Sequence, residues 1–100
     1  MKLGIHIKTD RHLDHAIGIV NAAVAGGHQV NIFTMSGGCR LLEKERFTSL
    51  CRLAGVTMTY CDFNATHMGI RKEMIPEEVV CGSQYHNVMM VGWADRVIVL

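Results

Sequence analysis

Apolar residues recur along this chain in two alternating patterns, and this alternation limits the possible folds more than any other feature of the sequence. Short runs rich in β-branched residues, such as Val56 to Tyr60, are typical of strands. Longer stretches, such as Arg11 to Ala25, place apolar residues three or four positions apart, which is the pattern of one helix face. We therefore expect strands that alternate with helices over residues 1–100.

Glycines and the single proline separate the expected elements, because both residue types interrupt regular structure. The expected strands are Leu3–Ile7, Val30–Met35, Val56–Tyr60, Val79–Cys81 and Arg96–Leu100. The expected helices are Arg11–Ala25, a helix in one or two pieces that places Leu42, Phe47, Leu50 and Leu53 inward, a short helix around Ala65–Met68, and a helix from Ser83 to Gly92.

Regular alternation of strand and helix predicts parallel strands that are joined by right-handed crossovers, with helices on both faces of the sheet. The nearly continuous apolar strands Val56–Tyr60 and Val97–Leu100 fit a sheet that is buried on both faces. The expected fold class is therefore α/β: a single three-layer α/β/α domain over residues 1–100, with a mostly parallel sheet of about five strands. The order of the strands stays open.

Charge and hydropathy argue against several classes of protein. The net charge is +1 and no basic face is visible, so we expect no nucleic-acid partner. No apolar run reaches the roughly 18–20 residues of a membrane span, and Met1 to Lys8 is too polar and short for a signal peptide. We expect a cytoplasmic protein whose four cysteines are reduced.

Ligands of open parallel sheets gather beyond the carboxyl ends of the strands, and chemically useful residues follow several of the expected strands. Cys61 is the best candidate for a reactive residue, because it lies where a strand gives way to a short helix and helix N-termini stabilise a thiolate. Asp62 acts against this, since a neighbouring carboxylate disfavours the thiolate, and His67 could serve as a base. Asp10 and His12 follow the first strand and are possible auxiliary residues.

The other cysteines have less certain roles. Cys81 could act as a resolving thiol that forms a disulfide with Cys61 if their strands are neighbours, or it could simply pack in the core. Cys39 follows two glycines and is expected to be an exposed loop residue, whereas Cys51 is expected to be buried. The spacing of Cys39, Cys61, Cys81 and the six histidines is long and irregular, so we predict neither a metal nor a cofactor.

Three segments resemble the DsrE/DsrF-like (DsrE/F/H) family of sulfur-relay proteins in their order and spacing. They are Cys61-Asp-Phe-Asn-Ala-Thr-His-Met-Gly69, Ile75-Pro-Glu-Glu-Val-Val-Cys-Gly-Ser83 and Ala94-Asp-Arg-Val-Ile-Val-Leu100. Thr9-Asp10 and Gly27-His28 are also similar, so the resemblance extends over nearly the whole chain. Cys39 and Cys81 lie outside the family pattern.

The resemblance implies a three-layer α/β/α fold and a homo-oligomer or hetero-oligomer. It also implies that Cys61 carries sulfane sulfur as a persulfide, received from a donor protein and passed to an acceptor protein by thiol exchange. The high apolar content suggests a subunit interface as well, for which Met89, Met90 and Trp93 are candidates. Two other hypotheses remain open: a thiol redox protein or sensor that pairs Cys61 with Cys81 or Cys39, and a non-catalytic binding module.

Overall fold

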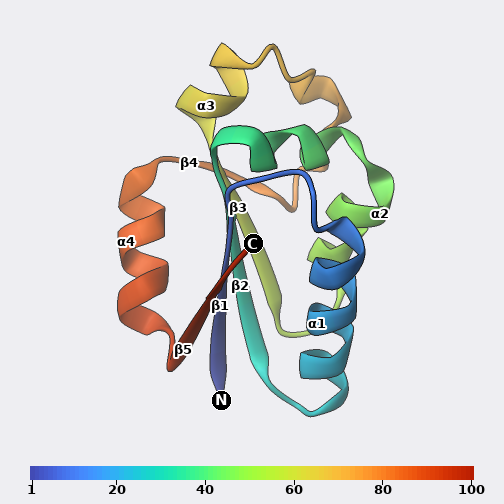
Figure 1. Cartoon of the computed structure of the whole chain (residues 1–100), viewed down its shortest axis with the longest axis vertical. Helices are drawn as coiled ribbons and strands as arrows, with labels where there is room; N and C mark the ends of the chain where they lie inside the picture. The colour runs from blue at the N-terminus through green and yellow to red at the C-terminus, as the bar shows by residue number, and fades with distance from the viewer.

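The computed structural model describes all residues, 1–100, and contains one sheet of five parallel strands (Figure 1). The order across the sheet is β4-β3-β2-β1-β5. The strands are β1 (Lys2–Ile7), β2 (Gln29–Thr34), β3 (Val56–Cys61), β4 (Val80–Gly82) and β5 (Arg96–Val99). The predicted α/β class and the five parallel strands are confirmed, and the strand order is now known.

Helices cover both faces of this sheet, as the alternating pattern predicts. They are α1 (Leu13–Ala25), α2 (Glu45–Thr48), α3 (Asp62–His67) and α4 (Gln84–Trp93), with 3₁₀ helices η1 (Ser36–Glu43), η2 (Ser49–Arg52) and η3 (Lys72–Met74). In Figure 1, α1 and α2 lie on one side of the sheet, α4 lies on the other, and α3 lies beyond the carboxyl end of β3.

Strand order explains this arrangement of the helices. The chain moves from β1 through β2 and β3 to β4 in one direction, and right-handed crossovers then place α1 and α2 on the same face. The chain returns across the sheet to β5, beside β1, so its last crossover helix, α4, lies on the opposite face. The result is a three-layer domain in which α4 alone covers one face.

Side chains alternate along each strand and so divide the core between the two faces. The larger cluster lies on the α1 and α2 side and includes Leu3, Ile5 and Ile7 of β1. The smaller cluster lies on the α4 side and consists of Phe33, Cys61 and Met90. Met90 reaches over Gly4, where a Cβ atom would collide with its sulfur. Met90 is therefore buried, and its predicted role in a subunit interface is wrong.

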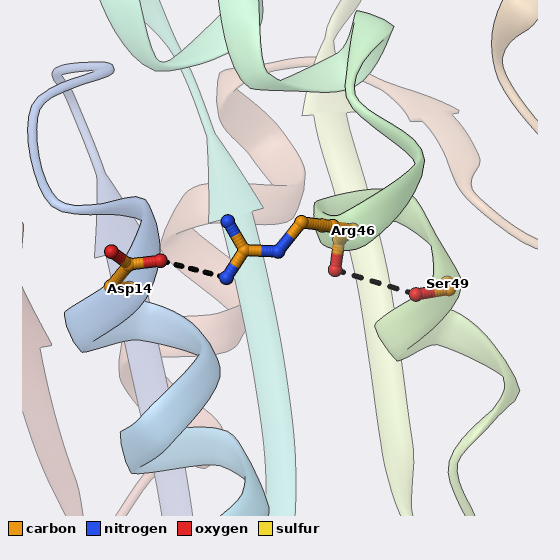
Figure 2. Close-up of polar contacts among 3 residues, drawn as sticks. All are labelled: Asp14, Arg46 and Ser49. Carbon is orange, nitrogen blue, oxygen red and sulfur yellow. Dashed lines mark hydrogen bonds and ion pairs between the residues drawn. The ribbon is translucent and has the colours of Figure 1, made fainter.

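An exposed ion pair joins the two helices on the first face. Arg46 Nη2 of α2 lies 2.7 Å from Asp14 Oδ1 of α1, and the Ser49 hydroxyl donates a hydrogen bond to the carbonyl oxygen of Arg46 (Figure 2). Because both charged side chains are largely exposed, solvent screening limits the pair to less than about 1 kcal/mol. No helix in the structure is long and apolar enough to cross a membrane.

Candidate functional site

Cys61 is the last residue of β3 and immediately precedes α3. Its backbone is extended, with φ −78° and ψ 109°, and the helix begins at Asp62 rather than near Ala65 as the sequence suggested. Its side chain is 3% exposed and packs against Phe33 and Met90 on the α4 side. The predicted position of Cys61, at a strand end followed by a short helix, is therefore correct.

Cys61 also lines the largest cavity of the molecule, an open hollow of about 890 Å³ beyond the carboxyl ends of β2, β3 and β4. Such a volume lies within the range of small-molecule sites. Three segments of the chain meet there, namely the end of β2, helix α3 and the start of α4. The lining residues are Met35, Cys61, Asp62, Phe63, Asn64, Thr66, His67, Gly82, Ser83 and Gln84.

The side of the cavity opposite α3 is formed by the end of β4 and the start of α4, and its shape depends on Gly82. Gly82 pairs with Cys61 across the sheet, and a Cβ atom on it would lie 2.5 Å from Thr59 Cγ2 and 2.7 Å from His86 Nδ1. Only glycine lets the first turn of α4 approach β3 this closely. The Ser83 side chain caps that helix by accepting a hydrogen bond from the backbone of Tyr85, and the Ser83 backbone in turn donates to His86 Nδ1.

Polar contacts hold the other two segments in place around the cavity. The side-chain oxygen of Asn64 in α3 accepts a hydrogen bond of 2.9 Å from the backbone of Ser36. Ser36 has a φ of 48°, an unusual value for a residue other than glycine, at the turn that follows β2. The amide of Gln84 donates to Met35 Sδ at 3.7 Å, which joins α4 to the end of β2.

The aromatic wall is formed by two residues one helical turn apart in α3. The rings of Phe63 and His67 are stacked, with centroids 4.5 Å apart and planes inclined by 30°. His67 thus lines the same cavity as Cys61, as the sequence suggested. Phe63 remains 67% exposed, which is a large apolar exposure for a residue beside a cavity.

The charge of Asp62 is neutralised by a partner that the sequence analysis missed. Lys72 of η3 donates hydrogen bonds to the Asp62 carboxylate and to the Thr66 hydroxyl, the latter at 2.7 Å. The hydrogen bond from Lys72 lowers the pKa of Asp62 below its usual value. Lys72 lies ten residues from Asp62 in sequence, on a segment with no clear periodicity, so no sequence signal indicated this pair. Lys72 therefore neutralises the carboxylate that the sequence analysis expected to disfavour a thiolate.

Cys39 is fully buried, which corrects the expectation of an exposed loop cysteine. The segment after β2 coils into η1 against the sheet, and the thiol of Cys39 donates a weak hydrogen bond to the carbonyl oxygen of Thr34 at 3.9 Å. Burial, together with the nearby Cys61, raises the pKa of Cys39 to about 11. Cys39 therefore remains a protonated thiol at neutral pH.

Cys81 is exposed and is not a core residue. The strands β3 and β4 are neighbours, but Cys81 pairs with Tyr60 whereas Cys61 pairs with Gly82. Because side chains alternate along a strand, the two thiols project from opposite faces of the sheet. Burial and a hydrogen bond with Cys81 raise the pKa of Tyr60 above its usual value, which also places Cys81 on the Tyr60 side.

The remaining candidates lie outside the cavity. Cys51 is half-buried in η2, and burial raises the pKa of its thiol. Asp10 and His12 are exposed between β1 and α1, where the ring of His12 contacts that of His15. No group of three or more His, Cys, Asp or Glu side chains comes together in a way that could hold a metal ion.

Sequence reasoning missed three neutral residues of the cavity. The sequence predicts Met35 as the last residue of a strand, whereas it follows the last residue of β2, and no sequence pattern singles out Thr66 or Gln84. Met35 and Gln84 could have been found by the rule that located Cys61, because ligands gather beyond the carboxyl ends of parallel strands and both residues lie just beyond such ends.

Comparison with known proteins identifies structures with the same fold but gives no activity. No protein-family model matches the chain, and no curated protein matches it either. The chain is similar in structure to the protein of unknown function MTH1491 from Methanobacterium thermoautotrophicum, with a TM-score of 0.76, 20% identity and coverage of 99% of this chain and 98% of that chain. It is also similar to the conserved protein of unknown function BT1422 from Bacteroides thetaiotaomicron (TM-score 0.78, 13% identity, coverage 99% and 94%).

A third similar structure is the ychN protein from E. coli, with a TM-score of 0.67, 14% identity and coverage of 99% of this chain and 97% of that chain. All three proteins match over nearly their whole length, so the complete three-layer domain is a shared fold. Their sequence identities with this chain are too low to transfer an activity.

Proposed function

We propose that this protein carries sulfane sulfur as a persulfide on Cys61. The observation that carries the proposal is that Cys61 is the one cysteine that lines the large cavity at the carboxyl edge of the sheet. None of the other thiols lines this cavity: Cys39 has a raised pKa, Cys81 projects from the opposite face of the sheet, and Cys51 lies in η2. The resemblance of the Cys61–Gly69, Ile75–Ser83 and Ala94–Leu100 segments to DsrE/DsrF-like sulfur-relay proteins supports the same residue.

The chemistry requires a thiolate and room for a second sulfur atom. Cys61 would attack the sulfane sulfur of a donor and form a new S–S bond, while the donor's own S–S bond breaks and its thiolate leaves. An acceptor thiolate would then attack the outer sulfur, which restores the Cys61 thiol. The open cavity provides the room, and His67, which lines it, is the candidate to take up and return the proton of Cys61. We expect the donor and acceptor to be proteins, as the family resemblance implies.

Intact mass measurement after incubation with inorganic polysulfide tests the proposal. We expect added mass in whole sulfur atoms on the wild type, removal of that mass by a reductant, and no corresponding adduct at position 61 in Cys61→Ser. Trypsin assigns the site directly, because the four cysteines fall in four different peptides: residues 12–40, 47–52, 53–71 and 73–96.

Cys81→Ser is the matched control, because Cys81 is the exposed thiol and would take up sulfur without selectivity. This variant should retain the adduct on the 53–71 peptide. An adduct that is found only on the 73–96 peptide, or one that is equally abundant on all four peptides, would contradict a dedicated role for Cys61.

We further propose that the protein acts as an oligomer that associates through its α4 side. Helix α4 contains no charged residue, and its exposed Val88, Met89 and Val91 lie on the same side of the sheet as the exposed Val97 and Val99 of β5. We call these five residues the α4 patch. Exposed apolar surface of this kind, free of charge, is typical of subunit interfaces. Trp93 is half-buried and could contribute at the edge of this surface.

We place this chemistry in the cytoplasm. The four cysteines are free, and a reducing compartment keeps thiols available for sulfur transfer.

A further inference from the structure

The cavity beside Cys61 is much larger than a persulfide needs, and few of its residues carry charge. Its volume is about 890 Å³, whereas the sulfur that Cys61 would carry is a single atom. No Lys or Arg lines it, and its carboxylate, Asp62, is already paired with Lys72. The cavity therefore offers no lysine or arginine to bind the carboxylates or phosphates of a strongly anionic molecule.

Phe63 gives this cavity an aromatic surface that is still largely exposed. Phe63 is 67% exposed although it stacks on His67, and it belongs to α3, which begins directly after Cys61. Met35, which is half-buried, lines the cavity as well, and thioether sulfur makes favourable contacts with aromatic rings. Neutral hydrogen-bonding groups complete the lining, namely the side chains of Asn64, Thr66 and Gln84.

From this neutral and partly aromatic lining, we infer the class of sulfur donor. The cavity accepts a small organic persulfide, R–S–S–H, whose substituent R is uncharged and aromatic or otherwise apolar, and R lies against Phe63. Small-molecule sites combine apolar walls with a few neutral polar groups in this way, and the cavity has a matching volume. The inference rests on the proposed function for its covalent step, and it replaces the protein donor that the family resemblance implies with a small molecule, while the acceptor remains a protein.

The step is a simple exchange that needs no further oxidant or reductant. The Cys61 thiolate forms a bond to the terminal sulfur of R–S–S–H, and the S–S bond of the donor breaks. The electron pair leaves with R–S⁻, which takes up the proton that Cys61 gave up. The products are Cys61–S–S–H and R–S–H, so atoms and electrons balance.

Loading rates with three donors test the inference. Wild-type protein is incubated with benzyl hydropersulfide, glutathione hydropersulfide or inorganic tetrasulfide, and the adduct on the 53–71 peptide is followed over time. We expect the benzyl donor to load Cys61 at least about fivefold faster than the glutathione donor, after correction for their rates with a free thiol. Phe63→Ala should reduce this ratio several-fold, which is the size of one aromatic contact, and should slow loading by the benzyl donor more than loading by tetrasulfide.

Tyr85→Ala is the matched control, because Tyr85 is an aromatic residue that is 66% exposed but does not line the cavity. It should leave the ratio at its wild-type value. Equal corrected rates with the two organic donors, or a ratio that Phe63→Ala does not change, would overturn the inference. Equal rates are also what a cavity shaped for a polypeptide donor would give.

A binding measurement separates this inference from the proposed function. Cys61→Ser cannot carry sulfur on residue 61, yet its cavity should still bind benzyl alcohol, an unreactive analogue of the donor. We expect NMR shift changes at Phe63 and His67 during the titration, and weaker binding by Phe63→Ala in the same background. If tetrasulfide loads Cys61 but benzyl alcohol does not bind, the inference fails and the function stands. If benzyl alcohol binds but no donor loads Cys61, the sulfur-carrier function fails.

Discussion

The thiol of Cys39 is fully buried, so its ionisation is linked to folding. Burial raises its pKa from 9.0 to about 11. Between these two values the unfolded chain releases the proton and the folded protein retains it, so the folded state binds more protons and stability falls as pH rises. We predict that the free energy of unfolding declines by roughly 2 kcal/mol through this window because of Cys39. Urea unfolding at a series of pH values measures it.

Cys39→Ala is the comparison for this prediction. Replacement lowers stability at every pH because it leaves a small cavity, but the variant should lose less stability than the wild type as pH rises from 9 to 11. The pKa of Tyr60 is also raised, mainly by its own burial, which adds a decline of the same sign above pH 10 in both proteins. Cys39 contributes least to that rise, so most of the Tyr60 decline cancels in the difference. Parallel pH profiles for the two proteins would contradict the assignment.

Alanine substitutions at two glycines should change the free energy of unfolding in opposite directions. At Gly38 a Cβ atom would collide with the backbone carbonyl oxygen of Ile7, whereas at Gly18, inside α1, it would meet no atom within 4 Å. We predict that Gly38→Ala lowers the free energy of unfolding by about 1–3 kcal/mol and that Gly18→Ala raises it by about 0.5–1 kcal/mol. Thermal and urea unfolding check both variants, and a neutral Gly38→Ala would show that η1 can move away from β1.

At the scale of elements, periodicity predicted the strands and the two longest helices because their apolar faces are continuous. It was weakest between residues 36 and 52, where the chain forms η1, α2 and η2 rather than one or two regular helices. The close approach of Gly38 to Ile7 shapes this segment, and no local pattern encodes a contact with a distant strand. The same tertiary packing buries Cys39, which is why its burial could not be predicted.

The candidate site could be predicted only in part for a related reason. The position of Cys61 followed from the rule that sites gather at the carboxyl edge of parallel strands. The separation of Cys61 from Cys81 depends on register, and a shift of one residue moves a side chain to the other face. The ion pair of Lys72 with Asp62 depends on how the loop after α3 folds back. Neither register nor loop path is visible in a single sequence.

The capping of α4 gives a prediction at the same scale. Ser83 accepts a hydrogen bond of 3.3 Å from the backbone of Tyr85, so Ser83→Ala should lower the free energy of unfolding by about 1 kcal/mol. Ser83→Asp should retain most of the stabilisation by the cap, because a carboxylate oxygen can accept the same hydrogen bond. Ser49→Ala is the control, since the Ser49 hydroxyl only donates to the carbonyl of Arg46, and we expect a change of a few tenths of a kcal/mol. Similar losses for both alanine variants would argue against a specific cap.

At the scale of the whole molecule, charge is distributed unevenly between the two faces of the sheet. Helices α1 and α2 carry charged residues, including the Asp14 and Arg46 pair. Helix α4 carries none, and Lys2 is the only charged strand residue whose side chain is on the α4 side. A second copy could therefore cover this side and bury at most the charge of Lys2, which lies over the ring of Trp93, whereas burying the α1 and α2 side would be costly.

This asymmetry makes the oligomeric state sensitive to a single charge. We predict that the wild type associates in solution and that Val88→Glu, in the centre of α4 and 68% exposed, dissociates it to monomers. Burying an uncompensated carboxylate at the interface costs several kcal/mol, whereas in the free monomer the same residue stays in water and leaves folding intact. Asn21→Glu is the matched control on exposed α1 and should associate like the wild type. Light scattering coupled to size-exclusion chromatography decides between these outcomes. A monomeric wild type would refute the α4 patch as an interface, and continued association of Val88→Glu would show that the interface lies on another face.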